Sequence, residues 1–255
     1  MPYYQSNALY DYFKKNYTPH FKFVSGNLWQ LIYGASNCSP KLLVLASGIS
    51  NNKLDSKFSE DELEAFKTLE ELSERTKIPL RFVRFIINER EVNEVFTFIN
   101  NENGRIVSMD TLSQLFGQSG LPISQTPTGK YLNDVESSAY HKWQRACLGS
   151  SLKVSDLDLL RFSNENKITH LYELKRSYYS LENWEPFSVD YNNFRLVSRL
   201  MKKANIKFQI IYNVRKKNPW HDDISKLKIF DVDIDDDRFI IFNKYVSLQA
   251  FIDKP

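Results

Sequence analysis

Three charged side chains interrupt two apolar runs of the sequence, and their types suit metal-assisted hydrolysis. Asp158 lies in VSDLDLLRF, while Glu173 and Lys175 lie in ITHLYELKRS. Two carboxylates that converge inside a sheet repel each other unless a cation lies between them. Hard oxygen ligands select Mg²⁺ or Mn²⁺, and a lysine beside such a metal can orient or activate a water and stabilise a developing anion. The cluster therefore predicts hydrolysis of a phosphodiester bond.

The spacing of these residues predicts which side chains meet. Residues two apart on a strand share a face, so Glu173 and Lys175 are expected to point the same way. The polar segment SNENK (163–167) predicts a tight turn that folds the two strands antiparallel. That turn would place Asp158 or Asp156 beside Glu173. A structural salt bridge on an exposed edge is the alternative for such a triplet, but the apolar flanking residues favour a functional cluster.

Asp156 and Asp158 are expected to share a face of the first strand, so the choice between them is open on spacing alone. We prefer Asp158 as the metal ligand. The number of residues between Asp158 and Glu173 suits a short hairpin, and the Leu159–Leu160 pair continues the strand. Asp156 would then lie near the metal without binding it, or be solvated.

Periodicity predicts the elements that position this hairpin. Apolar residues recur at helical spacing in 131–146, before the hairpin, and in 187–205, after it. A strand is predicted at 206–215, followed by two more at 226–233 and 238–246. Strand pairs that alternate with helices indicate an α/β (α+β) fold, with a mixed β-sheet flanked by helices.

The first part of the chain predicts an additional N-terminal α+β unit. Ser59 and Glu62 form a capping-box pattern at the start of the helix expected over 58–78. A second, short helix is expected at 108–117, and strands are expected at 21–34, 40–49, 79–88 and 94–100. The segment 117–130 is rich in Gly, Pro, Ser and Thr, which is typical of a boundary or surface loop. We therefore expect domains at 1–120 and 121–255.

The hairpin and its neighbours, over about 131–215, resemble the PD-(D/E)XK nuclease superfamily, the restriction-endonuclease-like folds. The resemblance rests on Asp158, on Glu173-Leu-Lys175 and on the helix that carries Glu136. It implies that Asp158 and Glu173 bind one or two divalent metals and that Lys175 activates the attacking water. Glu136 would be a further ligand, direct or through a water, unless it pairs with Lys142 or Arg145 or lies exposed. No proline precedes either Asp, which departs from the name-giving motif.

The resemblance implies a Mg²⁺-dependent endonuclease that cuts DNA, with Mn²⁺ as a substitute. The chain length suits a free-standing, site-specific type II restriction endonuclease of a restriction–modification system, acting as a homodimer. Residues 1–120 would then hold recognition or dimer contacts. One alternative is a phage-defence or DNA-repair nuclease that selects its substrate by structure or by a regulatory ligand. Another is a catalytically inert nucleic-acid-binding module.

Charge and composition limit the partners. The net charge is only +3, but residues 199–217 carry seven basic side chains and no acid, which suits a phosphate backbone. The TGK at 128–130 lacks the spacing and the following Ser or Thr of a phosphate loop, so no ATP site is expected. Candidate phosphate contacts are Arg176, Lys202, Lys203, Arg215, Lys216 and Lys217.

Cysteine, histidine and apolar patterning add expectations about location and metals. There is no run of about 18 uncharged apolar residues, so no membrane span is expected. Cys38 and Cys147 are far apart in sequence, and we expect reduced thiols in a cytoplasmic protein. His141, His170 and His221 form no metal-ligand pattern, and His170 is expected to be structural.

Overall fold

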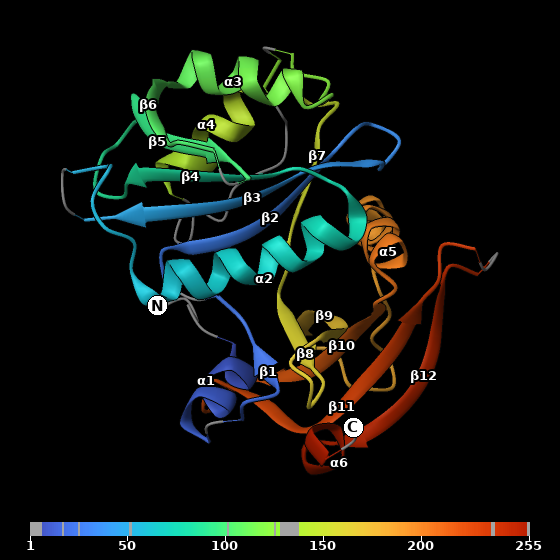
Figure 1. The fold of residues 1–255 in the computed structure, drawn as a ribbon. Helices are drawn as coiled ribbons and strands as arrows, with labels where there is room; N and C mark the ends of the chain where they lie inside the picture. The colour runs from blue at the N-terminus through green and yellow to red at the C-terminus, as the bar shows by residue number, and fades with distance from the viewer. Residues whose placement is uncertain are drawn as a thin grey trace. The chain divides into compact units, whose positions relative to one another are not determined.

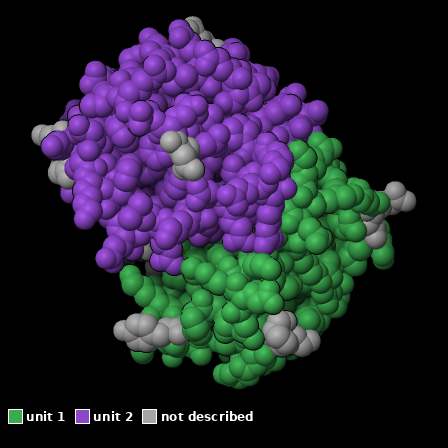
Figure 2. All heavy atoms as spheres, viewed as in Figure 1, with its two compact units in different colours: residues 1–23, 157–255 green, residues 24–156 purple. Residues whose placement is uncertain are grey.

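Two six-stranded sheets organise the chain, and the segment VSDLDLLRF contributes a strand to each of them. The structure is a computed structural model, and it describes residues 7–16, 18–24, 26–50, 53–100, 102–124, 126–127, 138–235 and 238–253. Residues 1–23 with 157–255 form one unit and residues 24–156 form another (Figure 2). We call these unit 1 and unit 2. The expected mixed α/β class is confirmed.

Unit 2 is built on the sheet β6-β5-β4-β3-β2-β7, in which β3 and β4 are parallel and the other neighbours are antiparallel. Its elements are β2 (Leu28–Gly34), β3 (Pro40–Ile49), α2 (Glu60–Thr76), β4 (Leu80–Ile86), β5 (Glu94–Ile99), β6 (Arg105–Ser108), α3 (Met109–Gln118), α4 (Ala139–Cys147) and β7 (Lys153–Asp156).

The central strand β3 is buried on both faces, which explains its nearly continuous apolar sequence PKLLVLASGI. Leu42 and Val44 belong to an apolar cluster with residues of α3 and α4. Leu43, on the opposite face by alternation, lies on the side of the sheet that α2 covers (Figure 1). The predicted capping box of α2 is confirmed, since Ser59 and Glu62 exchange both hydrogen bonds.

One buried ion pair connects α2 to the sheet of unit 2. The guanidinium of Arg84, on β4, is fully buried and binds both carboxylate oxygens of Glu62, with Nε–Oε1 at 2.9 Å and Nη2–Oε2 at 2.7 Å. Its Nη1 donates to the carbonyls of Leu54 and Ser56. Burial raises the pKa of Glu62, but hydrogen bonds from Arg84, Ser47 and Ser59 outweigh burial, so the pKa is lowered. The pair therefore holds a loop, a helix start and two strands together.

Unit 1 is built on the sheet β1-β8-β9-β10-β11-β12, in which β9 and β10 are parallel. The other neighbouring pairs of this sheet are antiparallel. Its elements are α1 (Ala8–Lys15), β1 (Phe21–Lys22), β8 (Leu159–Phe162), β9 (Ile168–Ser177), the 3₁₀ turn η1 (Ser188–Asp190), α5 (Tyr191–Ala204), β10 (Lys207–Lys216), β11 (His221–Val232), β12 (Ile240–Ser247) and α6 (Leu248–Asp253).

The two faces of the unit 1 sheet are covered by different helices. Leu9 and Phe13 of α1 and Phe251 of α6 form one cluster with Tyr172 and Ile211 of the sheet. Ile210 and Tyr212 lie on the opposite face by alternation, where α5 packs on β10. The connection from β9 through α5 to β10 is the crossover that parallel neighbours require. The predicted order of hairpin, helix and strand is therefore confirmed.

Several expectations differ from the structure. The segment 21–34, expected as one strand, contributes β1 to the sheet of unit 1 and β2 to that of unit 2. The segment VSDLDLLRF (154–162) is not one strand, because the chain leaves β7 at Asp156 and begins β8, in the other sheet, at Leu159. The units divide at 23/24 and 156/157, whereas the sequence-based division lies at 120/121. The helices α1 and α6 were not anticipated. Of the helix expected over 131–146, residues 139–147 form α4, and 131–137 lie outside the described residues.

We predict that Arg84→Met lowers the unfolding free energy by about 3–5 kcal/mol, because it leaves the buried Glu62 carboxylate without its cation. Arg75→Met is the matched control, since Arg75 pairs with Glu71 along the surface of α2 and such pairs contribute only about 0.3–0.5 kcal/mol. Denaturant unfolding of both variants measures the difference. A loss below about 1 kcal/mol for Arg84→Met would contradict the structural role of the pair.

Candidate active site at the carboxyl end of β9

Strand alternation directs Glu173 and Lys175 toward α5. Between them, Leu174 packs against the cluster formed by α1, α6 and the sheet, so its two neighbours point to the opposite face. Glu173 is buried, and the Lys175 ammonium lies 5.5 Å from the centre of the Phe194 ring on α5. The predicted shared face of Glu173 and Lys175 is therefore confirmed.

The hairpin places Asp158 against β9. The turn 163–167 joins β8 and β9, which pair antiparallel with Leu159 opposite Tyr172. Asp158 directly precedes β8, and its Oδ2 accepts a hydrogen bond of 2.7 Å from the backbone N–H of Leu174. That N–H lies between Glu173 and Lys175 in the chain, so Asp158 is next to both. This is the juxtaposition that the sequence predicts.

Lys175 is held by carboxylates. Its Nζ lies 2.9 Å from Glu173 Oε1 and 3.7 Å from Asp190 Oδ2. Burial lowers the pKa of Lys175, but the charges of Glu173 and Asp190, the hydrogen bond with Glu173 and the charge of Asp158 outweigh burial and raise that pKa above its usual value. Lys175 is consequently a cation at neutral pH, so it can donate hydrogen bonds to a water or an oxyanion and cannot accept a proton.

Sequence reasoning missed Asp190, the third carboxylate at Lys175. It ends η1 and occupies the N-cap position of α5, where an aspartate usually accepts a hydrogen bond from the first turn. Here its side chain makes no capping bond and is directed to Lys175 instead. The sequence SVDYNN gives the position of the helix start, but it gives no sign that this acid reaches the hairpin.

Asp156 and Glu136 are placed differently from Asp158. Asp156 is exposed on β7, opposite Leu31 of β2, and belongs to the sheet of unit 2. The expectation that Asp156 and Asp158 share a face of one strand is wrong, because Leu157, which is buried, and Asp158 lie outside both strands. Glu136 lies outside the described residues. The structure therefore brings Asp158, Glu173, Lys175 and Asp190 together.

The candidate phosphate contacts separate into two groups. Arg176, Arg215, Lys216 and Lys217 lie at the carboxyl ends of the parallel strands β9 and β10. Lys202 and Lys203 are exposed in the last turn of α5. Asp190 lies at the first turn of that helix, about 18 Å away along its axis at 1.5 Å per residue. The first group thus lies at the same edge of the sheet as Lys175, because Lys175 is opposite Tyr212 in the β9–β10 pair, and the second group does not.

Asp158 and Glu173 suit a hard divalent cation but form only part of its shell. Among the described residues there is no group of three or more His, Cys, Asp or Glu side chains that is arranged to hold a metal. Mg²⁺ is commonly bound by one or two carboxylates, with waters and substrate phosphate oxygens completing six ligands. Two oxygen donors beside a lysine cation fit that pattern. Glu136 stays a predicted further ligand.

No contact between the described histidines and the cluster of Asp158, Glu173, Lys175 and Asp190 is found. Burial lowers the pKa of His141 to about 4, although the charge of Asp156 acts against it, and the ring contacts the Ser138 hydroxyl at 2.8 Å. Burial and the charge of Arg161 likewise lower the pKa of His170 to about 4. His170 stacks on Tyr172, as a structural residue would. Cys38 and Cys147 form no disulfide bond.

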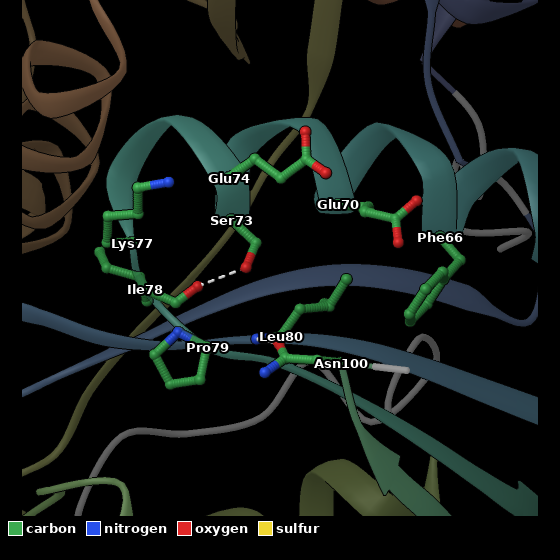
Figure 3. A pocket seen from close by; sticks show the side chains of 9 residues that line it. All are labelled: Phe66, Glu70, Ser73, Glu74, Lys77, Ile78, Pro79, Leu80 and Asn100. Carbon is green, nitrogen blue, oxygen red and sulfur yellow. Dashed lines mark hydrogen bonds between the residues drawn. The ribbon is translucent and has the colours of Figure 1, made fainter. Parts of the chain in front are cut away.

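Two pockets are lined by residues of unit 2. One, of about 360 Å³, lies between α2 and the start of β4, with Phe66 and Glu70 on the helix side and Leu80 on the strand side (Figure 3). Its Ser73 hydroxyl is engaged with the carbonyl of Ile78. The other, of about 450 Å³, is lined in part by the Glu62–Arg84 pair. Neither includes Asp158, Glu173 or Lys175. A regulatory ligand bound at 1–120 stays a prediction.

Comparisons with known proteins give no family for the chain. No protein-family model matches it, and no curated protein matches it. Among solved structures, the crystal structure of a sex pheromone staph-cAM373 precursor is similar over 90% of this chain and 88% of that chain, at 11% sequence identity and a TM-score of 0.18. A TM-score this low carries no argument. No helix among the described residues is long and apolar enough to cross a membrane.

We predict that Lys175→Met lowers the unfolding free energy by roughly 1–3 kcal/mol at pH 7, because the buried Glu173 carboxylate loses the ammonium that lies 2.9 Å from it. The folded pKa of Lys175 is raised, so the wild-type advantage should be constant from pH 6 to 9. It should decline above about pH 10.4, the ordinary lysine value, where the unfolded chain loses its proton first.

Denaturant midpoints of both proteins across this range measure the effect. Lys167→Met is the matched control, since Lys167 pairs with Glu165 in the exposed turn of the same hairpin and should show almost no change at any pH. A wild-type advantage that grows above pH 10.4 would contradict the assignment of Lys175 as a cation stabilised by its carboxylate neighbours.

Proposed function

We propose that the chain is a metal-dependent nuclease that hydrolyses DNA phosphodiester bonds. The observation that carries the proposal is the position of Asp158 against the Glu173-Leu174-Lys175 segment of β9, with its Oδ2 bonded to the N–H between the two charged residues. Two carboxylates and a lysine cation at the carboxyl end of a strand next to a parallel neighbour are the chemical groups that phosphodiester hydrolysis needs. The sequence β8, β9, α5, β10 is consistent with a restriction-endonuclease-like fold.

Each residue has a distinct part in the proposal. Asp158 and Glu173 would hold Mg²⁺, or Mn²⁺ in its place, which when bound neutralises charge on the phosphate and lowers the pKa of a bound water. Lys175 stays protonated, so it orients the attacking water or donates to a phosphate oxygen. It therefore positions and stabilises rather than accepts the proton. Asp190 helps to hold the lysine charged at this position.

The finer form of the proposal is site-specific cleavage by a homodimer, as in a type II restriction endonuclease. Its alternatives are a phage-defence or repair nuclease that selects substrate by structure, and an inert binding module. Incubation of plasmid DNA with Mg²⁺ separates the three, because they give discrete bands, a smear or no cleavage. Sequencing the ends of discrete products would then give the recognition site.

We predict that Asp158→Ala, Glu173→Ala and Lys175→Ala each reduce DNA cleavage by about a hundredfold or more, because groups that act as one unit lose most of the rate together. Asp156→Ala is the matched control and should cut normally, since Asp156 lies on the other sheet. Cleavage assays on folded variants measure this. Normal cutting by Asp158→Ala, with loss in Asp156→Ala, would reverse our choice of ligand.

We predict that cleavage requires Mg²⁺ or Mn²⁺ and that Ca²⁺ supports DNA binding without cutting. Calcium takes more ligands at longer distances than magnesium, so it would fill the position without the geometry that hydrolysis needs. Cleavage and binding are measured with each ion after chelation. Isothermal titration with the metal alone should show weaker Mn²⁺ binding in the Asp158→Ala and Glu173→Ala variants. Full activity in excess chelator would remove the metal from the proposal.

A further inference from the structure

Two exposed aromatic rings and a lysine lie just beyond the ends of β9 and β10. Tyr178 is 48% exposed and Trp220 is 49% exposed, and their ring centres are 5.5 Å apart, edge to face. The Lys217 ammonium lies 4.6 Å from the centre of the Tyr178 ring and 5.9 Å from that of Trp220. We call these three residues the Tyr178–Trp220 surface.

The topology of unit 1 brings this surface close to the candidate site. Because β9 and β10 are parallel, their carboxyl ends lie at the same edge of the sheet. Tyr178 directly follows β9, and Lys217 and Trp220 lie in the turn between β10 and β11. Tyr178 comes three residues after Lys175, which is about 10 Å along an extended strand.

The backbone and neighbours of the surface are held firmly although its rings are exposed. Arg215 hydrogen bonds to the Tyr178 hydroxyl and also donates to Asp222, whose carboxylate is buried. Arg176 donates to the same carboxylate at 2.6 Å. One residue further along, the carbonyl of Tyr179 accepts a hydrogen bond from the Tyr212 hydroxyl. The chain next to Tyr178 is therefore held in place, which reduces the entropy lost when this side of the surface binds a partner.

The chemistry of the surface indicates a ligand with flat apolar faces and negative charge. Exposed aromatic rings stack on nucleobases, and a lysine beside them contacts the phosphate. Around the rings, four basic side chains accompany two acidic ones: Arg176, Arg215, Lys216 and Lys217 with Asp222 and Asp223. The bases of a duplex are already stacked on each other, so they present only their edges to a protein. Unpaired bases fit the two rings better.

We propose that the Tyr178–Trp220 surface binds unpaired bases of single-stranded nucleic acid next to the candidate active site. This binding extends the proposed nuclease function, and the role of the surface in substrate choice rests on that function. It predicts that the substrate contains a single-stranded segment, such as an overhang, a flap or a locally opened duplex. Tyr178 and Trp220 each stack on a base, and Lys217 contacts the backbone.

The test is binding of a fluorescently labelled 12-nucleotide thymidine oligomer, and of a 12-base-pair duplex, by the full-length chain in chelator, where cleavage cannot interfere. Wild type should bind the single strand more tightly than the duplex. Tyr178→Ala and Trp220→Ala should each weaken single-strand binding by a factor of about 5 to 150, the equivalent of 1–3 kcal/mol per stacked base. Lys217→Ala should reduce the salt slope of log K by about 0.7.

Tyr245→Ala is the matched control. Tyr245 is 39% exposed on β12, and Lys226 lies 5.1 Å from the centre of its ring, so it repeats the chemistry of the surface away from β9. The Tyr245→Ala variant should bind the single strand as tightly as wild type. Unfolding midpoints of the variants establish that each is folded. Unchanged single-strand binding by both Tyr178→Ala and Trp220→Ala would overturn the proposal, and so would equal losses in Tyr245→Ala.

The outcome is separable from that of the nuclease proposal. If the ring variants lose single-strand binding while wild type cuts no DNA with any metal, the surface stands and the nuclease function fails. If wild type cuts and the ring variants bind single strands normally, the nuclease function stands and the surface fails. If the ring variants alter sedimentation of the free protein and leave single-strand binding unchanged, the rings contact a second copy and the proposal is wrong.

Discussion

The ammonium group of Lys175 makes it possible for carboxylates to gather at the buried end of β9. Glu173 is 7% exposed, and an ionised group this deep requires a partner. Lys175 supplies one at 2.9 Å and also attracts Asp190 and Asp158. The same ammonium lies over Phe194, so it connects the hairpin to α5. At this end of the sheet, one cation therefore contacts groups from the hairpin and from α5.

Arg84 and Lys175 each pair with a buried glutamate, and their surroundings show why one cation is structural and the other a candidate for chemistry. Arg84 is fully buried, and its three nitrogens are occupied by one carboxylate and two carbonyls. One acid balances one base there. The Lys175 side chain is 29% exposed, and three carboxylates surround it. These four side chains carry a net negative charge, which a divalent cation would neutralise.

The features of the fold that depend on residues close in sequence could be predicted, whereas those that depend on residues distant in sequence could not. Ser59 and Glu62 are three residues apart, and the turn 163–167 is flanked by the strands it joins, so the sequence was sufficient for both. The division of VSDLDLLRF (154–162) between two sheets depends on the pairing of β7 with β2, which is distant in sequence, while β8 pairs with β9. No period within VSDLDLLRF distinguishes one bent strand from two strands, and so the sequence predicts a shared face for Asp156 and Asp158 that the structure does not have.

Asp190 and the helix α6 were missed for the same physical reason. An aspartate before a helix is ordinarily a cap, and only the position of Lys175 on a neighbouring strand draws it away. The six residues of α6 are too few to form a stable helix alone. They are held because Arg161, buried on β8, donates to the carbonyls of Phe251 and Ile252. In both cases a strand residue far along the chain decides the conformation of a helix end.

The edge of the sheet at which β9 and β10 both end determines which basic residues lie near Lys175 and could contact a phosphate there. A run from Arg199 to Lys217 is continuous in sequence, but α5 and β10 are antiparallel segments of one crossover, so the two ends of the run are separated in space. Lys202 and Lys203 lie at the amino end of β10, whereas Lys216 and Lys217 lie at its carboxyl end. Only the second pair shares an edge with Lys175. A sequence count of basic residues therefore overstates the phosphate-binding surface by including charges that the crossover carries to the far end of the sheet.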